Sequence, residues 1–347
     1  MGNIKKIIPK YNVLNIQNAV IYAAKGYKIY KSLDEGESWE LDGKVKDSKY
    51  AFWANINRLL ARLLRIEVSD LIVLENGSRV VTARKGIFVA KANSKEYKQT
   101  FFVTRGTRPL NICIDKDNSL YFGEYLRNGP FVQEEREEVH IYKSKNYGQN
   151  WEVCYTFPKN TVRHIHGIFY DKFTNKMWFA TGDKGDECII GNTEDGFNTI
   201  NIVKQGKQKY RAVQLLFFKD FIVYGTDTEH EKNYIYRFDR EGNKEYSIQE
   251  IQGSVLAATQ IGEYACISTT VEPSEINDEP YAHLWFSRNG IDWHDIYKVK
   301  KDIFSLKYFQ YGKILFPHNA MINKQIVFTG HALEKFDNKT VIMELNL

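Results

Sequence analysis

Hydrophobic and polar residues alternate over short runs along most of this chain. Such runs are YKIYK at 27–31 and VHIYK at 139–143. Alternation with a period of two is typical of a β-strand that buries one face. The stretch at 51–66 differs, because ANINRLLARLLRI carries apolar residues at helical spacing with basic residues between them. The pattern therefore predicts an all-β chain with a short helical insertion at 46–66.

A turn motif recurs along the chain at regular distances. It reads SLDEGESW at 32–39 and SKNYGQNW at 144–151, with weaker copies NTEDGFNT at 192–199 and SRNGIDW at 287–293. The copies begin 112, 48 and 95 residues apart. These distances are close to two, one and two repeats of about 47 residues, a length typical of one four-stranded blade of a β-propeller.

The residue types of the motif suit a tight turn. The side chain of Asp34, or of Asn146 in the second copy, is placed to accept hydrogen bonds from turn amides. Gly36 supplies a positive φ at no steric cost, and Trp39 offers a large ring for packing between neighbouring sheets. The motif is therefore predicted to be an element of the fold.

Reading the strands in this register divides the chain into repeating units. The approximate units are 12–45, 67–104, 109–157, 163–204, 211–250, 254–299 and 303–347. The terminal run VIMELNL is predicted to pair with N-terminal residues, which removes exposed sheet edges. We predict a single seven-bladed β-propeller around a central channel over 1–347, with six or eight blades as alternatives. The helix at 51–66 is predicted to pack through one face, with a lid or a membrane or partner contact as the alternative.

The pattern S-x-D-x-G-x-x-W resembles the Asp-box (BNR) repeat of the sialidase-like propellers. The segments GEY, RHIH, TGD and YRA also resemble those of uncharacterised bacterial Asp-box propellers associated with surface polysaccharides. The resemblance implies a propeller that handles glycans. The sialidase signature F/Y-R-I-P is absent, and RGTRPL supplies an Arg-Pro pair without the aliphatic residue between, so no arginine triad is carried over residue by residue.

Composition narrows the classes of protein. The chain has 347 residues, 43% of them hydrophobic, and its net charge of +5 is well short of the basic stripe of a nucleic-acid binder. No run approaches the length of a transmembrane span, and the N-terminus lacks the apolar region of a signal peptide, so we expect a cytoplasmic protein. The four cysteines are scattered without metal-ligand spacing and are predicted to be free thiols.

The predicted topology assigns the polar loops to one face. If the strands of a blade are A to D and the turn motif joins C to D, antiparallel connectivity places the B–C and D–A loops on the opposite face. The D–A segments carry RGTRPL, VRHIHG and KYRAVQ, and the B–C loops carry GEYLRN, TGDKGDE, GTDTEHEKN and TTVEPSEIND. Arginine, histidine and carboxylate residues thus recur at equivalent strand ends, and we expect this face to be the functional one.

The candidate residues form two groups. Candidates for catalysis are His164, His166, Tyr210, Glu124, Asp183, Asp227 and Glu272. Candidates for substrate binding are Arg105, Arg108, Tyr125, Arg163, Arg211, His230 and His331. Arginine binds carboxylates through a bidentate fork, so the set favours an acidic oligosaccharide or polysaccharide as partner. His164 and His166 point to the same side of one strand, which leaves catalysis, packing and metal binding open, and we assign no metal or other cofactor.

Two reactions and one binding role remain open. A glycosidase of the sialidase type would use an acid and a nucleophile among the carboxylates, or Tyr125 or Tyr210 as nucleophile. A polysaccharide lyase would neutralise a uronate carboxylate with arginine while His164, His166 or Tyr210 removes the C5 proton. A non-catalytic propeller would bind a glycan or a protein through the same face. The many titratable groups favour an enzyme, and hydrolysis of a uronate- or nonulosonate-containing glycan is the leading prediction.

Overall fold

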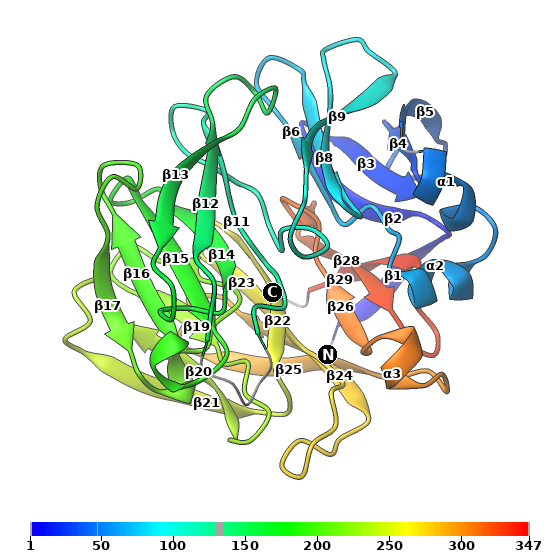
Figure 1. Cartoon of the computed structure of the whole chain (residues 1–347). Helices are drawn as coiled ribbons and strands as arrows, with labels where there is room; N and C mark the ends of the chain where they lie inside the picture. Colours follow the sequence, from blue (N-terminus) through cyan, green and yellow to red (C-terminus); the bar gives the residue numbers. More distant parts are fainter. Residues whose placement is uncertain (1, 47, 130–134, 346–347) are drawn as a thin grey trace. The chain divides into compact units, whose positions relative to one another are not determined.

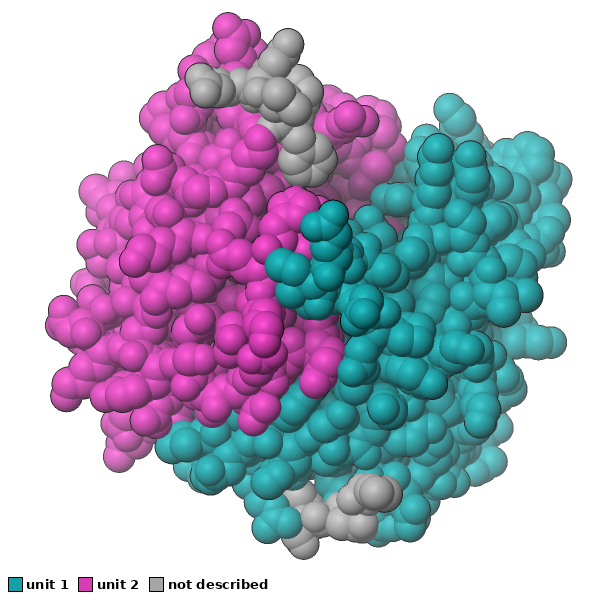
Figure 2. Space-filling view, turned by 90° about the horizontal axis from the view of Figure 1, so that it is seen from below, with its two compact units in different colours: residues 1–84, 88–99, 256–347 teal, residues 85–87, 100–255 magenta. Residues whose placement is uncertain are grey.

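The computed structural model describes residues 2–46, 48–129 and 135–345, and most of its regular structure is β-strand (Figure 1). The chain forms two compact units (Figure 2). Unit 1 comprises residues 1–84, 88–99 and 256–347, and unit 2 comprises residues 85–87 and 100–255. Each unit has hydrophobic clusters of its own, which include Tyr97 and Phe328 in unit 1 and Trp178 and Phe179 in unit 2.

Unit 2 contains three four-stranded antiparallel sheets whose strands pair in chain order. The first sheet consists of β10 (Cys113–Ile114), β11 (Leu120–Gly123), β12 (Val139–Ser144) and β13 (Glu152–Phe157). The second consists of β14 (His164–Asp171), β15 (Lys176–Gly182), β16 (Ile189–Thr193) and β17 (Asn201–Gln205). The third consists of β18 (Leu216–Phe217), β19 (Ile222–Gly225), β20 (Asn233–Phe238) and β21 (Glu245–Ile251).

The remaining strands form three further sheets. The eight-stranded sheet joins two sets of four through parallel pairing of β5 and β9. These sets are β2 (Asn12–Gln17), β3 (Val20–Lys25), β4 (Lys28–Ser32) and β5 (Glu40–Val45), and β6 (Asp70–Val73), β7 (Arg79–Ala83), β8 (Gly86–Ala90) and β9 (Glu96–Phe102). The four-stranded sheet is β22 (Val255–Ile261), β23 (Tyr264–Thr269), β24 (Tyr281–Ser287) and β25 (Trp293–Lys300). The last is β26 (Lys313–Leu315), β27 (Met321–Ile322), β28 (Gln325–His331), β29 (Lys339–Glu344) and β1 (Asn3–Pro9).

The predicted strand register agrees with these sheets. The predicted segments 109–157, 163–204 and 211–250 each hold one of the three sheets of unit 2. The antiparallel pairing of β29 with β1 confirms that the C-terminal strand joins N-terminal residues, while residues 346–347 at its predicted end lie outside the described residues. With the eight-stranded sheet taken as two sets, the described strands make seven sets of about four, and the number of blades stays a prediction.

The four predicted turns each connect the third and fourth strands of a set, as the sequence indicated. In the first turn, Ser32 Oγ accepts a hydrogen bond from the Gly36 amide at 2.8 Å, and Asp34 Oδ1 accepts one from the Ser38 amide at 2.9 Å. The Trp39 indole donates to the Gly36 carbonyl at 3.2 Å. Two other turns have the same hydrogen bonds. The Gly148 and Gly290 amides donate to Ser144 Oγ and Ser287 Oγ, and the Trp151 and Trp293 indoles donate to the carbonyls of the same two glycines. The turns therefore lie at the strand ends opposite to the B–C and D–A loops.

The helical insertion consists of two short helices, α1 (Ser48–Ala54) and α2 (Arg58–Leu64), where the sequence predicted a single helix over 51–66. Asn57 separates them, because its side chain accepts a hydrogen bond from the Leu60 amide and thereby caps α2. Residue 47, at the start of the predicted insertion, lies outside the described residues. None of the helices in the described ranges is long and apolar enough to cross a membrane.

Arg62 anchors α2 within unit 1. Its side chain is fully buried, and its Nη1 lies 2.5 Å from a carboxylate oxygen of Asp302. Its Nη2 donates at 2.6 Å to the carbonyl of Phe309, the last residue of α3 (Leu306–Phe309). Phe52 and Trp53 of α1 are exposed. The insertion thus packs through one side, which agrees with the expected amphipathic pattern.

Candidate functional site

A polar cluster in unit 2 is built where strands begin and end. β14 and β15 pair so that His164 lies opposite Gly182, which places the next residue, Asp183, beside the histidines of β14. Arg163 directly precedes β14, and Arg211 directly follows the 3₁₀ turn η2 (Gln208–Tyr210). We refer to the following residues as the unit-2 cluster: Arg163, His164, His166, Asp183, Arg211 and Asp227.

Asp183 is the residue that joins most members of the cluster. Its Oδ2 accepts a hydrogen bond from Arg163 Nη1 at 2.8 Å. Its Oδ1 lies 3.2 Å from His164 Nε2 and 3.3 Å from His166 Nε2. Arg211 Nη2 lies 3.4 Å from the same Oδ1. No more than 8% of Arg163, His164, His166 or Asp183 is exposed, so these contacts are largely shielded from water.

The charges of the cluster follow from burial and from these contacts. Burial alone would raise the pKa of Asp183, but its contacts with the imidazoles of His164 and His166 lower that pKa more strongly. The Asp183 carboxylate is therefore ionised. Burial lowers the pKa of His164, and the neighbouring His166 adds to this effect, while contact with Asp183 opposes it. His164 is therefore neutral near pH 7.

Arg211 connects the second and third sheets of unit 2. Besides Asp183, it approaches Asp227, with Nε 3.2 Å from Oδ2, and Glu229, with Nη2 3.8 Å from Oε1. The Nε–Asp227 contact has the distance of an ion pair without the alignment of a hydrogen bond. Burial alone would lower the pKa of Arg211, whereas the charges of Asp227 and Asp183 raise it more. The guanidinium is thus a fixed positive charge between two carboxylates.

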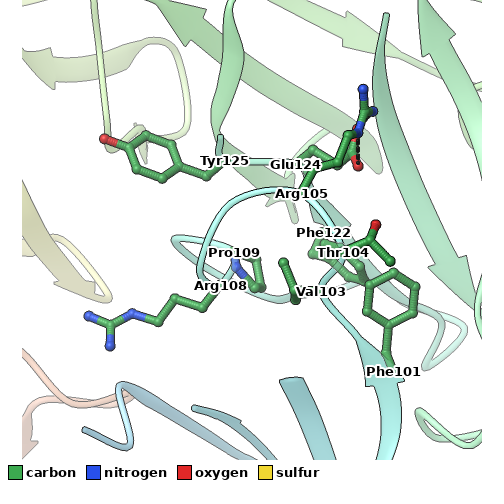
Figure 3. A pocket seen from close by; sticks show the side chains of 10 residues that line it. Phe101, Val103, Thr104, Arg105, Arg108, Pro109, Phe122, Glu124 and Tyr125 are labelled. Atoms are coloured by element: carbon green, nitrogen blue, oxygen red, sulfur yellow. Dashed lines mark hydrogen bonds and ion pairs between the residues drawn. The ribbon is translucent and has the colours of Figure 1, made fainter. Parts of the chain in front are cut away.

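A small pocket formed by the D–A loop before β10 and the B–C loop after β11 lies in the same unit (Figure 3). Glu124 pairs there with Arg105, whose Nε lies 3.2 Å from Oε1 and whose Nη2 contacts Oε2. In Figure 3, the side chains of Tyr125 and Arg108 extend to one side, and the Glu124–Arg105 pair points to another. A Cβ at Gly106, whose φ is +80°, would lie 2.2 Å from the Tyr125 carbonyl oxygen. The close approach of the two loops therefore requires glycine.

Tyr125 links this pocket to the cluster. Its ring centroid lies 4.3 Å from that of His164 and 6.4 Å from that of His166. Burial raises the pKa of Tyr125 to about 12, and the charges of Asp183 and Asp227 contribute to the rise. The phenol therefore keeps its proton near pH 7, next to the imidazoles.

Four of the predicted site residues lie elsewhere. Tyr210 is buried in a hydrophobic cluster with Trp178 and Phe238. His230 is exposed on the loop between β19 and β20. Glu272 and His331 belong to unit 1, where Nδ1 of His331 lies 3.1 Å from Arg58 Nη2. Within unit 2, the structure brings the six cluster residues together and places Tyr125 against them.

The sequence did not reveal the backbone groups that orient the histidines. His164 Nδ1 lies 3.0 Å from the Leu126 carbonyl oxygen, and His166 Nδ1 lies 2.9 Å from that of Ala212. Every residue type has a backbone carbonyl, so a pattern of residue types cannot predict which carbonyl contacts a histidine ring. Gly182 was also missed as a functional position, although a glycine directly before a candidate carboxylate is a visible signal.

Replacing Gly182 by alanine is expected to displace the His166 ring. The added Cβ would lie 2.5 Å from His166 Cε1 and 3.3 Å from Arg211 Cγ. Such overpacking is expected to lower the free energy of unfolding by about 1–3 kcal/mol, which urea unfolding measures. ¹⁵N-edited NMR is expected to show shifted signals of the His166 imidazole. Gly185→Ala is the control, because a Cβ there meets nothing within 4 Å, although its φ of +31° adds a small strain of its own. Unchanged His166 signals in Gly182→Ala would contradict the described packing.

Comparison with known proteins gives a fold but no family. No family model and no curated protein sequence matches the chain. Among solved structures, an oligogalacturonate lyase in complex with manganese has a TM-score of 0.59 and 10% identity, over 97% of this chain and 90% of that one. A GH74 enzyme from Niastella koreensis has a TM-score of 0.54 and 10% identity, over 85% of this chain and 46% of that one.

Similar structures are not confined to enzymes that act on carbohydrates. A chain of a mitotic checkpoint complex has a TM-score of 0.57 and 8% identity, over 99% of this chain and 92% of that one. With the strand pairing described above, these similarities place the chain in the all-β propeller class. At such low identity they define the fold alone, and the chemistry of the site has to be argued from its residues.

Proposed function

We propose that this protein is a carbohydrate-active enzyme that cleaves an acidic glycan at the unit-2 cluster. The observation that carries the proposal is the convergence of Arg163 and Arg211 on Asp183, next to two buried imidazoles, at the ends of strands from neighbouring sheets. Arginine is suited to bind the carboxylate of a uronate or nonulosonate. Perturbed, buried titratable groups gathered at one place are typical of catalytic sites.

The fold and the turns support a glycan-active protein of the sialidase-like type. The hydrogen bonds of the S-x-D-x-G-x-x-W turns are those expected of Asp-box repeats, which we propose these turns to be. Two of the similar structures are an oligogalacturonate lyase and a GH74 enzyme. From these two enzymes we infer only the general class of substrate, a carbohydrate. We do not infer the reaction of either enzyme for this chain.

Hydrolysis and β-elimination make different demands on the carboxyl groups. A glycosidase needs one protonated carboxyl as general acid. Asp183 is ionised beside Arg163, and Glu124 is paired with Arg105, so neither is arranged as that acid. Elimination needs arginine to neutralise the uronate carboxylate and does not need a carboxylic acid. This observation favours a lyase as the second candidate beside the sialidase-type glycosidase.

Incubation with a panel of acidic polysaccharides tests the proposal, with a neutral glucan as the matched control. Ultraviolet absorbance reports the unsaturated uronate that a lyase forms, and a reducing-end assay reports cleavage by either reaction. We expect products from at least one acidic polymer and none from the glucan. Reducing ends without ultraviolet absorbance would assign hydrolysis. Binding of acidic polymers without any product would overturn the enzyme proposal and leave a glycan-binding propeller.

A further inference from the structure

The imidazoles of His164 and His166 are held in one tautomer. Each Nδ1 faces a backbone carbonyl, that of Leu126 or that of Ala212, at hydrogen-bond distance. A carbonyl oxygen only accepts hydrogen bonds, so each Nδ1 carries the hydrogen. The Nε2 atom of a neutral ring then presents a lone pair. Backbone carbonyls commonly fix metal-binding histidines in this way, by holding the nitrogen that does not bind the metal.

Three lone pairs converge at one point in the cluster. His164 Nε2 lies 3.1 Å from His166 Nε2, and Asp183 Oδ1 lies 3.2 Å and 3.3 Å from these two nitrogens. With Nδ1 holding the ring hydrogen, each Nε2 can offer its lone pair beside Asp183 Oδ1, and the three atoms lie within 3.3 Å of one another. Acceptors at this distance repel one another unless a cation or a proton lies between them. One proton is shared poorly among three acceptors, whereas one metal ion binds all three.

The spacing of the three atoms matches a metal site. Bonds of about 2.1 Å to nitrogen and oxygen place neighbouring ligands about 3.0 Å apart at octahedral angles and about 3.4 Å apart at tetrahedral angles. The three observed separations, 3.1, 3.2 and 3.3 Å, fall between these limits. The atoms therefore occupy one face of a coordination sphere and leave its other positions for water or substrate.

The surroundings keep the three ligands in place. Arg163 holds Oδ2 of Asp183, which leaves Oδ1 directed at the histidines. Gly182 allows the His166 ring to pack against the backbone, because any Cβ there would overlap it. Arg211 Nη2 also lies 3.4 Å from Oδ1, and a carboxylate oxygen has a second lone pair for it.

We propose that His164 Nε2, His166 Nε2 and Asp183 Oδ1 bind a divalent transition-metal ion. Two imidazole nitrogens and one carboxylate oxygen suit zinc and its first-row neighbours. They do not suit Ca²⁺ or Mg²⁺, which prefer oxygen ligands throughout.

The ion changes the charge that an acidic substrate meets. Around Asp183, the guanidinium groups of Arg163 and Arg211 are outnumbered by three carboxyl groups, those of Asp183, Asp227 and Glu229. A divalent ion adds two positive charges to this group and makes the site more favourable for an anionic substrate. The ion then acts with the arginines in binding the sugar carboxylate, a role that rests on the proposed function, whereas metal binding itself does not.

Metal binding is tested on the whole chain without any glycan, so its outcome is independent of glycan cleavage. The protein is treated with a chelator and dialysed against Zn²⁺, its metal content is measured by mass spectrometry, and calorimetry gives the affinity. We expect one equivalent of zinc in the wild-type chain. His166→Ala and Asp183→Asn are expected to lower the affinity at least about a hundredfold, because the first removes a ligand and the second removes the negative charge of another.

His294→Ala is the matched control, since His294 is exposed on β25, and it is expected to keep full zinc binding. Circular dichroism checks the fold of each variant. Co²⁺ gives a second readout on the wild-type chain alone, because nitrogen and oxygen ligands in a protein site intensify its visible absorption. A wild-type chain that takes up neither ion stoichiometrically, or a folded His166→Ala that binds zinc as tightly as wild type, would overturn the proposal.

Discussion

Replacing Arg163 by lysine is expected to slow cleavage of the acidic glycan by about a hundredfold to a thousandfold. Arg163 holds Oδ2 of Asp183 from a buried position, and the planar guanidinium fork fixes that carboxylate in direction as well as in charge. Lysine keeps the positive charge but has a flexible, single-point ammonium. The loss of rate in Arg163→Lys therefore reports how well Asp183 is oriented, and we expect it mainly in kcat. The far-ultraviolet circular dichroism of the variant is expected to stay unchanged.

Arg127→Lys is the matched control for this prediction. Arg127 is exposed on the same B–C loop as Glu124 and Tyr125, and its replacement is expected to leave the rate within about twofold. A folded Arg163→Lys that cleaves at the wild-type rate would show that the unit-2 cluster is not where the reaction occurs. An equal loss in both variants would indicate a general effect of surface charge.

Replacing Arg62 by alanine is expected to lower the free energy of unfolding by about 3–5 kcal/mol. The change removes a fully buried side chain, one of the two cations paired with half-buried Asp302, and the hydrogen bonds to the Phe309 carbonyl. Urea unfolding measures the loss. Exposed Arg65, three residues further along, is the control, and Arg65→Ala is expected to change stability by less than about 1 kcal/mol. The single variant Arg62→Met is expected to lose less than Arg62→Ala, because methionine fills more of the buried space while Lys301 still pairs with Asp302.

The loss in Arg62→Ala is also expected to depend on pH. Burial would raise the pKa of Asp302, but its hydrogen bonds with Arg62 and Lys301 lower it below its ordinary value of 3.8. A carboxyl whose folded pKa is depressed contributes stability above its unfolded pKa and loses that contribution as the pH falls through its folded pKa. The difference between wild type and Arg62→Ala should therefore shrink below about pH 4. A difference that stays constant well below about pH 4 would mean that Arg62 acts through packing alone.

The sequence predicted the strands and the grouping of the polar loops because both follow from periodicity and antiparallel order. The turn motif located the connection between third and fourth strands, and antiparallel order then placed the loops of Arg163, Asp183 and Arg211 at the other strand ends. Their meeting in space was predictable from topology, although these residues lie in different parts of the chain.

The direction of individual side chains was less predictable. Tyr210 directly precedes Arg211, and the sequence assigned both to the site. The 3₁₀ turn η2 carries the Tyr210 ring into a hydrophobic cluster, while Arg211 reaches Asp183. Neighbouring loop residues have no fixed alternation, so no periodic rule separates the two. The break between α1 and α2 did have a signal, since Asn57 is a favoured N-cap residue within the predicted helix.

The metal site lay beyond what the residue pattern could show. Two histidines with one residue between them fit packing, catalysis or metal binding, and the sequence alone favoured packing over a metal. The proposed metal site depends on which ring nitrogen of each histidine carries the hydrogen. The carbonyls of Leu126 and Ala212, which belong to segments distant in the sequence, determine this by contacting Nδ1 of the two rings.

The most direct test of the account is an NMR titration of the ¹⁵N-histidine-labelled chain with short acidic oligosaccharides. The chain has eight histidines, of which His164 and His166 belong to the unit-2 cluster. The account predicts that an oligosaccharide from a polymer which the protein cleaves shifts the imidazole signals of these two residues. The signals of His283, His294 and His318 in unit 1 are expected to stay unchanged. Shifts confined to histidines of unit 1, or no shift with any acidic oligosaccharide, would contradict the assignment of the site.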